Sequence, residues 1–162
     1  MQELFEYIFE KPELRKLKHE LQETVLFRNL TAHELDKVIT HCHLRSFKKG
    51  EHIFFEGDPG SALFIVLKGG VQIVRHVSGK HVPLATLTKG MFFGELALVY
   101  HTPRTATGLV TEDALLVCLF KHDFDKIVKH YPVLGSKLLH VVSQILAQRL
   151  SVMIEHSVGK QK

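Results

Sequence analysis

The sequence predicts a mainly β fold, a jelly-roll-like β-roll of about eight strands with flanking helices. Between His43 and Phe120, β-branched and aromatic residues arrive in short apolar runs that turn-forming residues separate. The runs are HIFF, ALFIVL, VQIV, VPLATL and ALLVCLF, and the breaks fall at Gly50, Gly57 to Gly60, Gly69-Gly70, Ser78-Gly79 and Gly90. Apolar residues before and after this region recur at helical spacing. Because no helix-length segment separates the runs, an antiparallel roll over 43–120 is favoured over a parallel sheet.

Residues 1–42 are expected to be helical and to precede the roll. Apolar side chains have helix-like spacing over 2–9 and again over 13–23. Pro12 separates the two segments, since proline disrupts the interior of a helix. Two short helices are therefore expected, one over 2–9 and one over 13–23.

A helix start signal predicts a third helix over residues 31–42. Thr31 and Glu34 have the spacing of a capping box, in which each side chain accepts a hydrogen bond from the backbone of the other residue. Leu30 and Leu35 have the spacing of a hydrophobic staple. Both features favour a helix that begins at Thr31.

Two further helices are expected over residues 121–156. Phe124, Ile127 and Val128 form one apolar face of the first helix. A longer helix is expected over 133–155, with one polar stripe formed by Lys137, His140, Gln144, Gln148, Ser151 and Glu155. Most of its other positions are apolar. This wide apolar arc either packs entirely on the roll and the neighbouring helices, or leaves one strip for a partner chain.

Length and composition predict one cytoplasmic domain, residues 1–162. Hydrophobic residues make up 45% of the 162 residues and charged residues 23%, which is ordinary for a soluble domain. No window approaches the roughly 20 apolar residues of a membrane span, and the acidic N-terminus does not resemble a secretory signal. We therefore expect no contact with a membrane. Cys42 and Cys118 are expected to be buried free thiols.

The basic charge is too dispersed to predict a nucleic-acid surface. The net charge is +4, and no basic run recurs at helical spacing. A small anionic ligand, by contrast, needs only one or two cations.

The segment FGELALVYHTPRTAT, residues 93–107, has one acid, Glu95, and one base, Arg104. A short helix is expected inside it, and the N-terminus of a helix presents unpaired N–H groups that suit an anion. Gly94 and Ala97 keep the side chains small there, while Arg104 can offer two parallel N–H donors to phosphate oxygens. Glu95 would repel a phosphate, so it is expected to accept hydrogen bonds from hydroxyl groups. A phosphate site beside a hydroxyl acceptor indicates a ribose phosphate.

This segment resembles the phosphate-binding cassette of the cyclic nucleotide-binding domain family. That family is found in cyclic-nucleotide-dependent protein kinases, gated channels and catabolite-activator-type transcription factors. The resemblance covers roughly residues 26–155 and includes LFRNLTAHEL, FKKGEHIFFEGDPGSALFIVLKGGVQI and the segment 93–107. It implies a roll that contains the cassette, followed by helices that rearrange when ligand binds.

The resemblance implies that Glu95 binds the ribose 2′-hydroxyl and that Arg104 binds the exocyclic phosphate oxygens. The implied ligand-binding set is Gly94, Glu95, Leu96, Ala97, Arg104, Thr105 and Ala106. It also implies that the last helix closes over the base, which makes Met153 and Ile154 the candidate capping residues. In the catabolite-activator type this region supplies hydroxyl groups to adenine, whereas here it is apolar.

The function implied by the resemblance is that of a regulatory sensor. Its ligand is a cyclic nucleotide, cAMP or cGMP, and cAMP is favoured as the commoner ligand, although Thr105 is compatible with either. No catalytic cofactor and no metal are expected. The last helix would transmit binding to an effector protein or to a second copy of the chain. Direct DNA binding is not expected, because no helix-turn-helix motif follows the long helix before Lys162.

Two alternatives stand beside the sensor. The first is a ligand-free interaction or dimerisation module, whose degenerate cassette holds Glu95 and Arg104 as a structural ion pair. The second is a metal-dependent, cupin-like enzyme, because the chain has 12 histidines. Such a site needs histidines on facing strands, whereas His41 and His43 straddle a helix end and other histidines flank turns. We therefore expect that the protein is not an enzyme.

Overall fold

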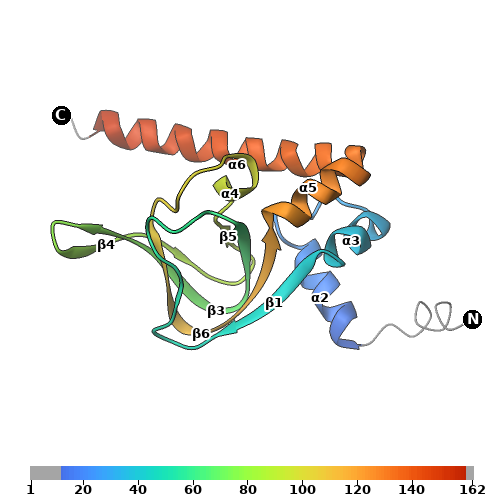
Figure 1. The fold of residues 1–162 in the computed structure, drawn as a ribbon, viewed down its shortest axis with the longest axis horizontal. Coiled ribbons are helices and arrows are strands. Elements are labelled where there is room, and N and C mark those ends of the chain that lie inside the picture. The colour runs from blue at the N-terminus through green and yellow to red at the C-terminus, as the bar shows by residue number, and fades with distance from the viewer. Residues whose placement is uncertain (1–11, 160–162) are drawn as a thin grey trace, which may run out of the picture.

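The computed structural model describes residues 12–159 and shows an antiparallel β-roll with flanking helices (Figure 1). The elements are α2 (Pro12–Gln22), α3 (Ala32–Ile39), β1 (Cys42–Phe47), β2 (His52–Phe54), β3 (Ala62–Val77), β4 (Lys80–Leu87), β5 (Phe92–Phe93), α4 (Leu96–Val99), β6 (Thr107–Phe120), α5 (Lys121–His130) and α6 (Pro132–Gly159). The predicted fold class, mainly β with helices on both sides in sequence, is confirmed. The helix predicted over 2–9 lies outside the described residues.

Two long strands form the centre of the sheet. The strand order is β1-β6-β3-β4, with β2 paired to β6 and β5 paired to β3. The 16 residues of β3 and the 14 of β6 pair antiparallel, from Ala62 opposite Phe120 to Val74 opposite Thr107. Register shifts interrupt this ladder and bend both strands. Six named strands therefore build a roll for which about eight shorter strands were expected.

The first six residues of β3, Ala62 to Leu67, are buried on both faces. In β3, Leu63 and Ile65 belong to a core that the strands share with the helices. Phe64 and Val66 alternate with them and belong to a second core inside the roll. Because successive side chains of a strand point to opposite faces, a strand between two cores is apolar at every position. This accounts for the unbroken run ALFIVL.

The helix α3 begins as the sequence predicts. The Thr31 hydroxyl accepts a hydrogen bond from the Glu34 backbone N–H at 3.2 Å, and the Glu34 carboxylate accepts one from the Thr31 N–H at 2.8 Å. Leu30 and Leu35 are both buried in the core that the helices share with the roll. The capping box therefore orients a helix whose apolar side closes one end of the roll.

The long helix α6 runs across one side of the roll and passes over α4 (Figure 1). Its first half is buried through Leu134, Leu138, Val141 and Val142. Its last described turns expose Leu150, Val152, Met153 and Ile154. The expected packing on the same chain therefore accounts for the first half of the apolar arc, and the partner strip stays a prediction. None of the helices described over 12–159 has the length and apolarity to span a membrane.

Candidate functional site

The segment 93–107 turns sharply before the short helix α4. Gly94 has φ +77°, a left-handed backbone conformation that residues with a Cβ seldom adopt. A Cβ added there would lie 2.7 Å from Nη1 of Arg104 and 2.8 Å from the carbonyl oxygen of Ala62. Glycine is therefore required both for the turn and for the close approach of the guanidinium group.

Arg104 is held by the roll itself. Its residue is only 9% exposed, and its Nη2 donates a hydrogen bond to the Ala62 carbonyl at 2.8 Å. The guanidinium lies 4.2 Å from the ring centroid of Phe54 and 5.6 Å from that of Phe64. Two aromatic faces and one carbonyl thus stabilise a buried cation. Its position is fixed by strands rather than by loops.

Burial lowers the pKa of the Arg104 guanidinium, while the nearby carboxylates of Asp58 and Glu95 raise it. An arginine keeps its charge in proteins even when its pKa is lowered. Arg104 is therefore a desolvated cation that attracts an anion more strongly than a solvated one would.

Glu95 is held by the last helix. The residue is 4% exposed, and Arg149 of α6 donates a hydrogen bond from Nη1 to Glu95 Oε1. Nη2 of Arg149 also donates to the carbonyl of Phe92 at 3.3 Å. The same guanidinium lies 5.5 Å from the Phe92 ring centroid. The ion pair that was expected between Glu95 and Arg104 in a degenerate cassette is therefore not formed; Glu95 pairs with Arg149.

Glu95 and Arg104 share a second property. Among the residues that the structure describes, only Glu95 Oε2 and Arg104 Nε are buried side-chain polar atoms without a hydrogen-bond partner. Leaving a buried donor or acceptor unpaired costs about 1 to 3 kcal/mol, and more for charged groups. The two side chains that the sequence singled out are thus the two with unused hydrogen-bonding capacity.

The other predicted site residues surround these two side chains along the chain. Ala97 and Ala106 are buried, whereas Leu96 and Thr105 are exposed. The Ala97 N–H donates a hydrogen bond to the Gly94 carbonyl at 3.1 Å, so this amide is already used within the turn. The ligand contacts predicted for these residues stay predictions.

The two candidate capping residues lie far along α6. Met153 is 65% exposed and Ile154 is 55% exposed. They follow Arg149 by about one helical turn, on the part of α6 whose apolar residues are exposed. Their predicted contact with a base stays a prediction.

Sequence reasoning missed Arg149, although a signal for it exists. Between Lys137 and Glu155 it is the only arginine or lysine of the predicted helix. Arg149 is thus a lone cation in this part of its helix, as Glu95 is the lone acid of the segment 93–107. Two lone charges of opposite sign are candidates for an ion pair, and this would have connected Arg149 with Glu95.

A cupin-like enzyme would need several histidines grouped around one metal ion. Within residues 12–159, no group of three or more histidine, cysteine or acidic residues has a geometry that could hold a metal ion. His101, within the segment 93–107, does not adopt a positive φ. The turn at His101 is therefore not strained in that way.

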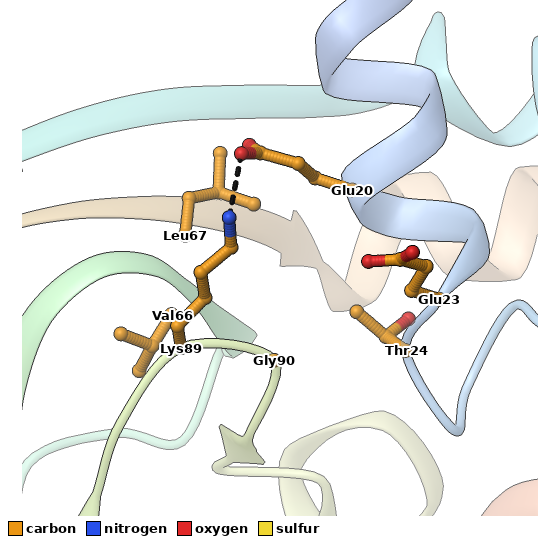
Figure 2. Close-up of a pocket in the computed structure, with 7 residues that line it drawn as sticks. All are labelled: Glu20, Glu23, Thr24, Val66, Leu67, Lys89 and Gly90. Atoms are coloured by element: carbon orange, nitrogen blue, oxygen red, sulfur yellow. Dashed lines mark hydrogen bonds and ion pairs between the residues drawn. The ribbon is translucent and has the colours of Figure 1, made fainter.

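A separate hollow of about 350 Å³ lies between α2 and the roll. Figure 2 shows Lys89 reaching toward Glu20 across it, and their Nζ and carboxylate oxygen are 2.8 Å apart. Its other lining residues are Glu23, Thr24, Val66, Leu67 and Gly90. None of the predicted ligand-binding residues lines this hollow.

Comparison with known proteins gives one matching family. The sequence model described as "Cyclic nucleotide-binding domain" matches residues 44–131. The chain is 33% identical over 126 residues to the cyclic AMP receptor protein of Thermus thermophilus, which covers 77% of this chain and 56% of that protein. It is also 35% identical over 101 residues to human cGMP-dependent protein kinase 2, covering 61% of this chain and 13% of the kinase.

Solved structures agree with these sequence matches. The catabolite activator protein of Thermus thermophilus superposes with a TM-score of 0.75 at 31% identity, covering 85% of this chain and 63% of that one. The regulatory domain of Toxoplasma gondii PKA with cAMP gives a TM-score of 0.66 at 31% identity, covering 75% and 48%. The chain spans 56% of the first curated relative and about a fifth of the next two, which are 21% and 19% covered.

The close approach at Gly94 generates a stability prediction. Gly94→Ala should destabilise the fold by about 1 to 2 kcal/mol for the left-handed backbone, and by about 1 to 3 kcal/mol more for crowding Arg104. Gly90→Ala is the matched control, because Gly90 has φ +84° and nothing within 4 Å of an added Cβ. Urea unfolding measures both. Equal losses for the two variants would show that Arg104 does not need the space at Gly94.

The pairing of Arg149 with Glu95 generates a second prediction. Arg149→Met leaves a buried carboxylate without its cation and should lower the free energy of unfolding by about 1 to 3 kcal/mol. In a Glu95→Gln background the same change should cost less than about 1 kcal/mol, because no charge is left unpaired. The exposed neighbour Gln148→Met controls for substitution on this turn. Additive losses for Arg149→Met and Glu95→Gln would contradict the pairing.

Proposed function

Because the chain belongs to the cyclic nucleotide-binding domain family, we propose that it is a regulatory sensor that binds a cyclic nucleotide at residues 93–107, with cAMP favoured over cGMP. The observation that carries this proposal is the unused hydrogen-bonding capacity of Glu95 Oε2 and Arg104 Nε. A cyclic nucleotide offers a hydroxyl group to the first and phosphate oxygens to the second.

Arg104 is the proposed phosphate ligand. Its Nη2 is engaged by Ala62, while Nε has no partner, so donors are left for an anion. The aromatic rings of Phe54 and Phe64 lie against the guanidinium. They exclude water, and exclusion of water strengthens a charge-assisted hydrogen bond.

Glu95 is the proposed ribose ligand, and its two oxygens have separate partners. Oε1 accepts the hydrogen bond from Arg149, and Oε2 is buried without a partner. A ribose 2′-hydroxyl can donate to Oε2 while the contact with Arg149 persists. Gly94, Leu96, Ala97, Thr105 and Ala106 would complete the ligand-binding set.

Arg149 makes α6 the proposed transmitter. Because α6 is joined to the ribose ligand, a nucleotide that engages Glu95 changes the stability of this position of the helix. It can do so only by its different affinity for the two positions of the helix. Met153 and Ile154 would then cap the base, and the exposed turn of α6 would contact an effector protein or a second copy of the chain.

The preference for cAMP rests on the relatives and on the commonness of that ligand. One relative is a cyclic AMP receptor protein and another is a cGMP-dependent kinase, so the family includes both ligands. Thr105 is exposed and is compatible with either base. The proposal places the module in the cytoplasm, with no catalytic step and no direct contact with DNA or a membrane.

One observation favours a second candidate, a ligand-free interaction module. The Glu95 carboxylate already has a cation in Arg149, so the site is partly neutralised without a nucleotide. In that case α6 would present its exposed apolar turn constitutively. Calorimetric titration with cAMP and cGMP side by side separates the two candidates, since only the sensor binds either one.

Arg104→Leu tests the phosphate contact. Removing the cation should weaken cAMP binding by about 2 to 5 kcal/mol, because the phosphate loses a desolvated partner. Isothermal titration calorimetry measures the change, and circular dichroism checks the fold. Arg75→Leu is the matched control, since Arg75 lies on β3 and pairs with Glu56 at 3.3 Å. A change of less than about threefold for Arg104→Leu would reject the assignment.

Glu95→Ala tests the ribose contact separately. It should weaken cAMP binding by about 1 to 3 kcal/mol and should leave the affinity for 2′-deoxy-cAMP much less affected. The comparison of the two ligands within one variant cancels any effect on Arg149 or on the fold. If Glu95→Ala still prefers cAMP over its 2′-deoxy analogue by the wild-type factor, Glu95 does not bind the 2′-hydroxyl.

A further inference from the structure

A second buried carboxylate, Asp123, lies at the start of α5 and is surrounded by basic groups. Its side chain is 8% exposed. Lys126 Nζ is 2.9 Å from Oδ1, and His41 Nδ1 is 3.8 Å from the same oxygen. His122 Nε2 and His43 Nε2 are 3.1 Å and 3.3 Å from Oδ2. One carboxylate thus has four basic neighbours, of which three are histidines.

These neighbours come from separate parts of the fold. His41 lies in the turn after α3, and His43 lies on β1. Asp123, His122 and Lys126 lie on α5, which follows β6 directly and leads into α6. Figure 1 shows α5 beside α3 and the start of β1, where this junction is formed. The carboxylate therefore fastens the base of the C-terminal helices to the roll.

A thiol and an exposed ion pair also lie near the junction. Burial, the neighbouring Cys118 and Asp123 raise the pKa of the Cys42 thiol to about 12, so it stays neutral. Lys121 on α5 is paired with Asp125 at 2.7 Å. The ring of Phe120, which is uncharged, packs edge-on against the His43 ring. The variable charge at the junction is therefore that of the three histidines.

Asp123 itself stays ionised. Burial raises the pKa of its carboxyl group, but hydrogen bonds from Lys126 and His43 and the charge of His122 outweigh burial and lower it. Histidine is the side chain whose charge changes between about pH 5 and 8. Each histidine that gains a proton there converts a neutral contact with this carboxylate into an ion pair.

We propose that Asp123 with His41, His43 and His122 forms a proton-sensitive anchor that fastens α5 to β1 more firmly at pH 6 than at pH 8. The His43 ring is at hydrogen-bond distance from this carboxylate, and a charge-assisted hydrogen bond from a protonated ring is about twice as strong as a neutral one. Protonated rings also repel one another and Lys126. The carboxylate offsets this repulsion, so its removal should make protonation unfavourable for the junction.

The anchor does not depend on nucleotide binding. It adds a second input to α6, because α5 leads directly into that helix and packs against it. A change in the docking of α5 would alter the position from which α6 reaches the rest of the roll. The test below therefore measures the junction in the absence of any ligand, and its failure would leave the nucleotide assignment untouched.

Urea unfolding of the wild type and of Asp123→Asn at pH 6 and pH 8 tests the anchor. The unfolding equilibrium constant of the variant, relative to wild type, should be about fivefold larger at pH 6 than at pH 8. Glu23→Gln is the matched control, because His19 and Glu23 form a His–carboxylate pair at 3.7 Å whose side chains are 73% and 68% exposed. That control ratio should change less than about twofold between the two pH values.

The triple variant His41→Gln, His43→Gln and His122→Gln provides a second, independent test. Glutamine keeps a hydrogen-bonding group but cannot gain a proton. The unfolding equilibrium constant of the triple variant, relative to wild type, should therefore also be larger at pH 6 than at pH 8. Should either ratio be the same at both pH values, or should the ratio for Glu23→Gln increase equally toward pH 6, the proposed anchor would be overturned.

Discussion

The contact between Glu95 and Arg149 is the interaction on which the arrangement of the site depends. A carboxylate that is 4% exposed needs a cation, because burying an uncompensated charge is strongly unfavourable. The chain supplies that cation from α6, 54 residues further along. The place of the last helix and the conformation of residues 93–107 are therefore determined together. A change at either end of this contact must be felt at the other.

The two charges of the site are supported differently. Arg104 is held by the roll, through the Ala62 carbonyl and the faces of Phe54 and Phe64. These groups belong to strands that carry the cores of the protein, and such elements position a side chain more rigidly than loops do. Glu95 is held by a helix whose last turns are exposed. One end of the site is thus held by the strands of the roll, and the other end is held by α6.

The local signals of the sequence were sufficient for most of the fold. The capping residues Thr31 and Glu34 gave the start of α3, and the glycine breaks gave the roll, because turn and cap chemistry act over three or four residues. The strand count differed because Gly69-Gly70, which was expected to separate two strands, lies inside β3 at register shifts of its pairing with β6. How many other strands one long strand pairs with depends on the tertiary structure, and the spacing of residues along the chain does not predict it.

The candidate site shows the same boundary between local and distant information. Glu95 and Arg104 stand out in the sequence because both lie within one uncharged segment. Arg149 is separated from that segment by the rest of the roll and by α5, so only the folded chain brings it to Glu95. The burial of Glu95 and Arg104 likewise depends on the folded structure and could not be predicted from the sequence. The sequence singles out Glu95 and Arg104, but it does not establish that Glu95 pairs with Arg149.

For the proposed sensor, magnitudes decide how much the ribose contact can accomplish. Shifting a helix from 1% to 99% occupancy of one position needs a difference in ligand affinity of about 10⁴-fold, or about 5.5 kcal/mol. A hydrogen bond from a hydroxyl to a charged oxygen such as Glu95 Oε2 contributes only about 1.5 to 3 kcal/mol. The rest has to come from contacts that exist in one position of α6 alone. The exposed apolar turn of α6 that includes Met153 and Ile154 can supply it by burial against the base, since a buried aliphatic side chain contributes about 1.5 to 3 kcal/mol. A full switch therefore requires the ribose and the base to act on the same helix, through Arg149 at one turn and through the apolar residues at the next.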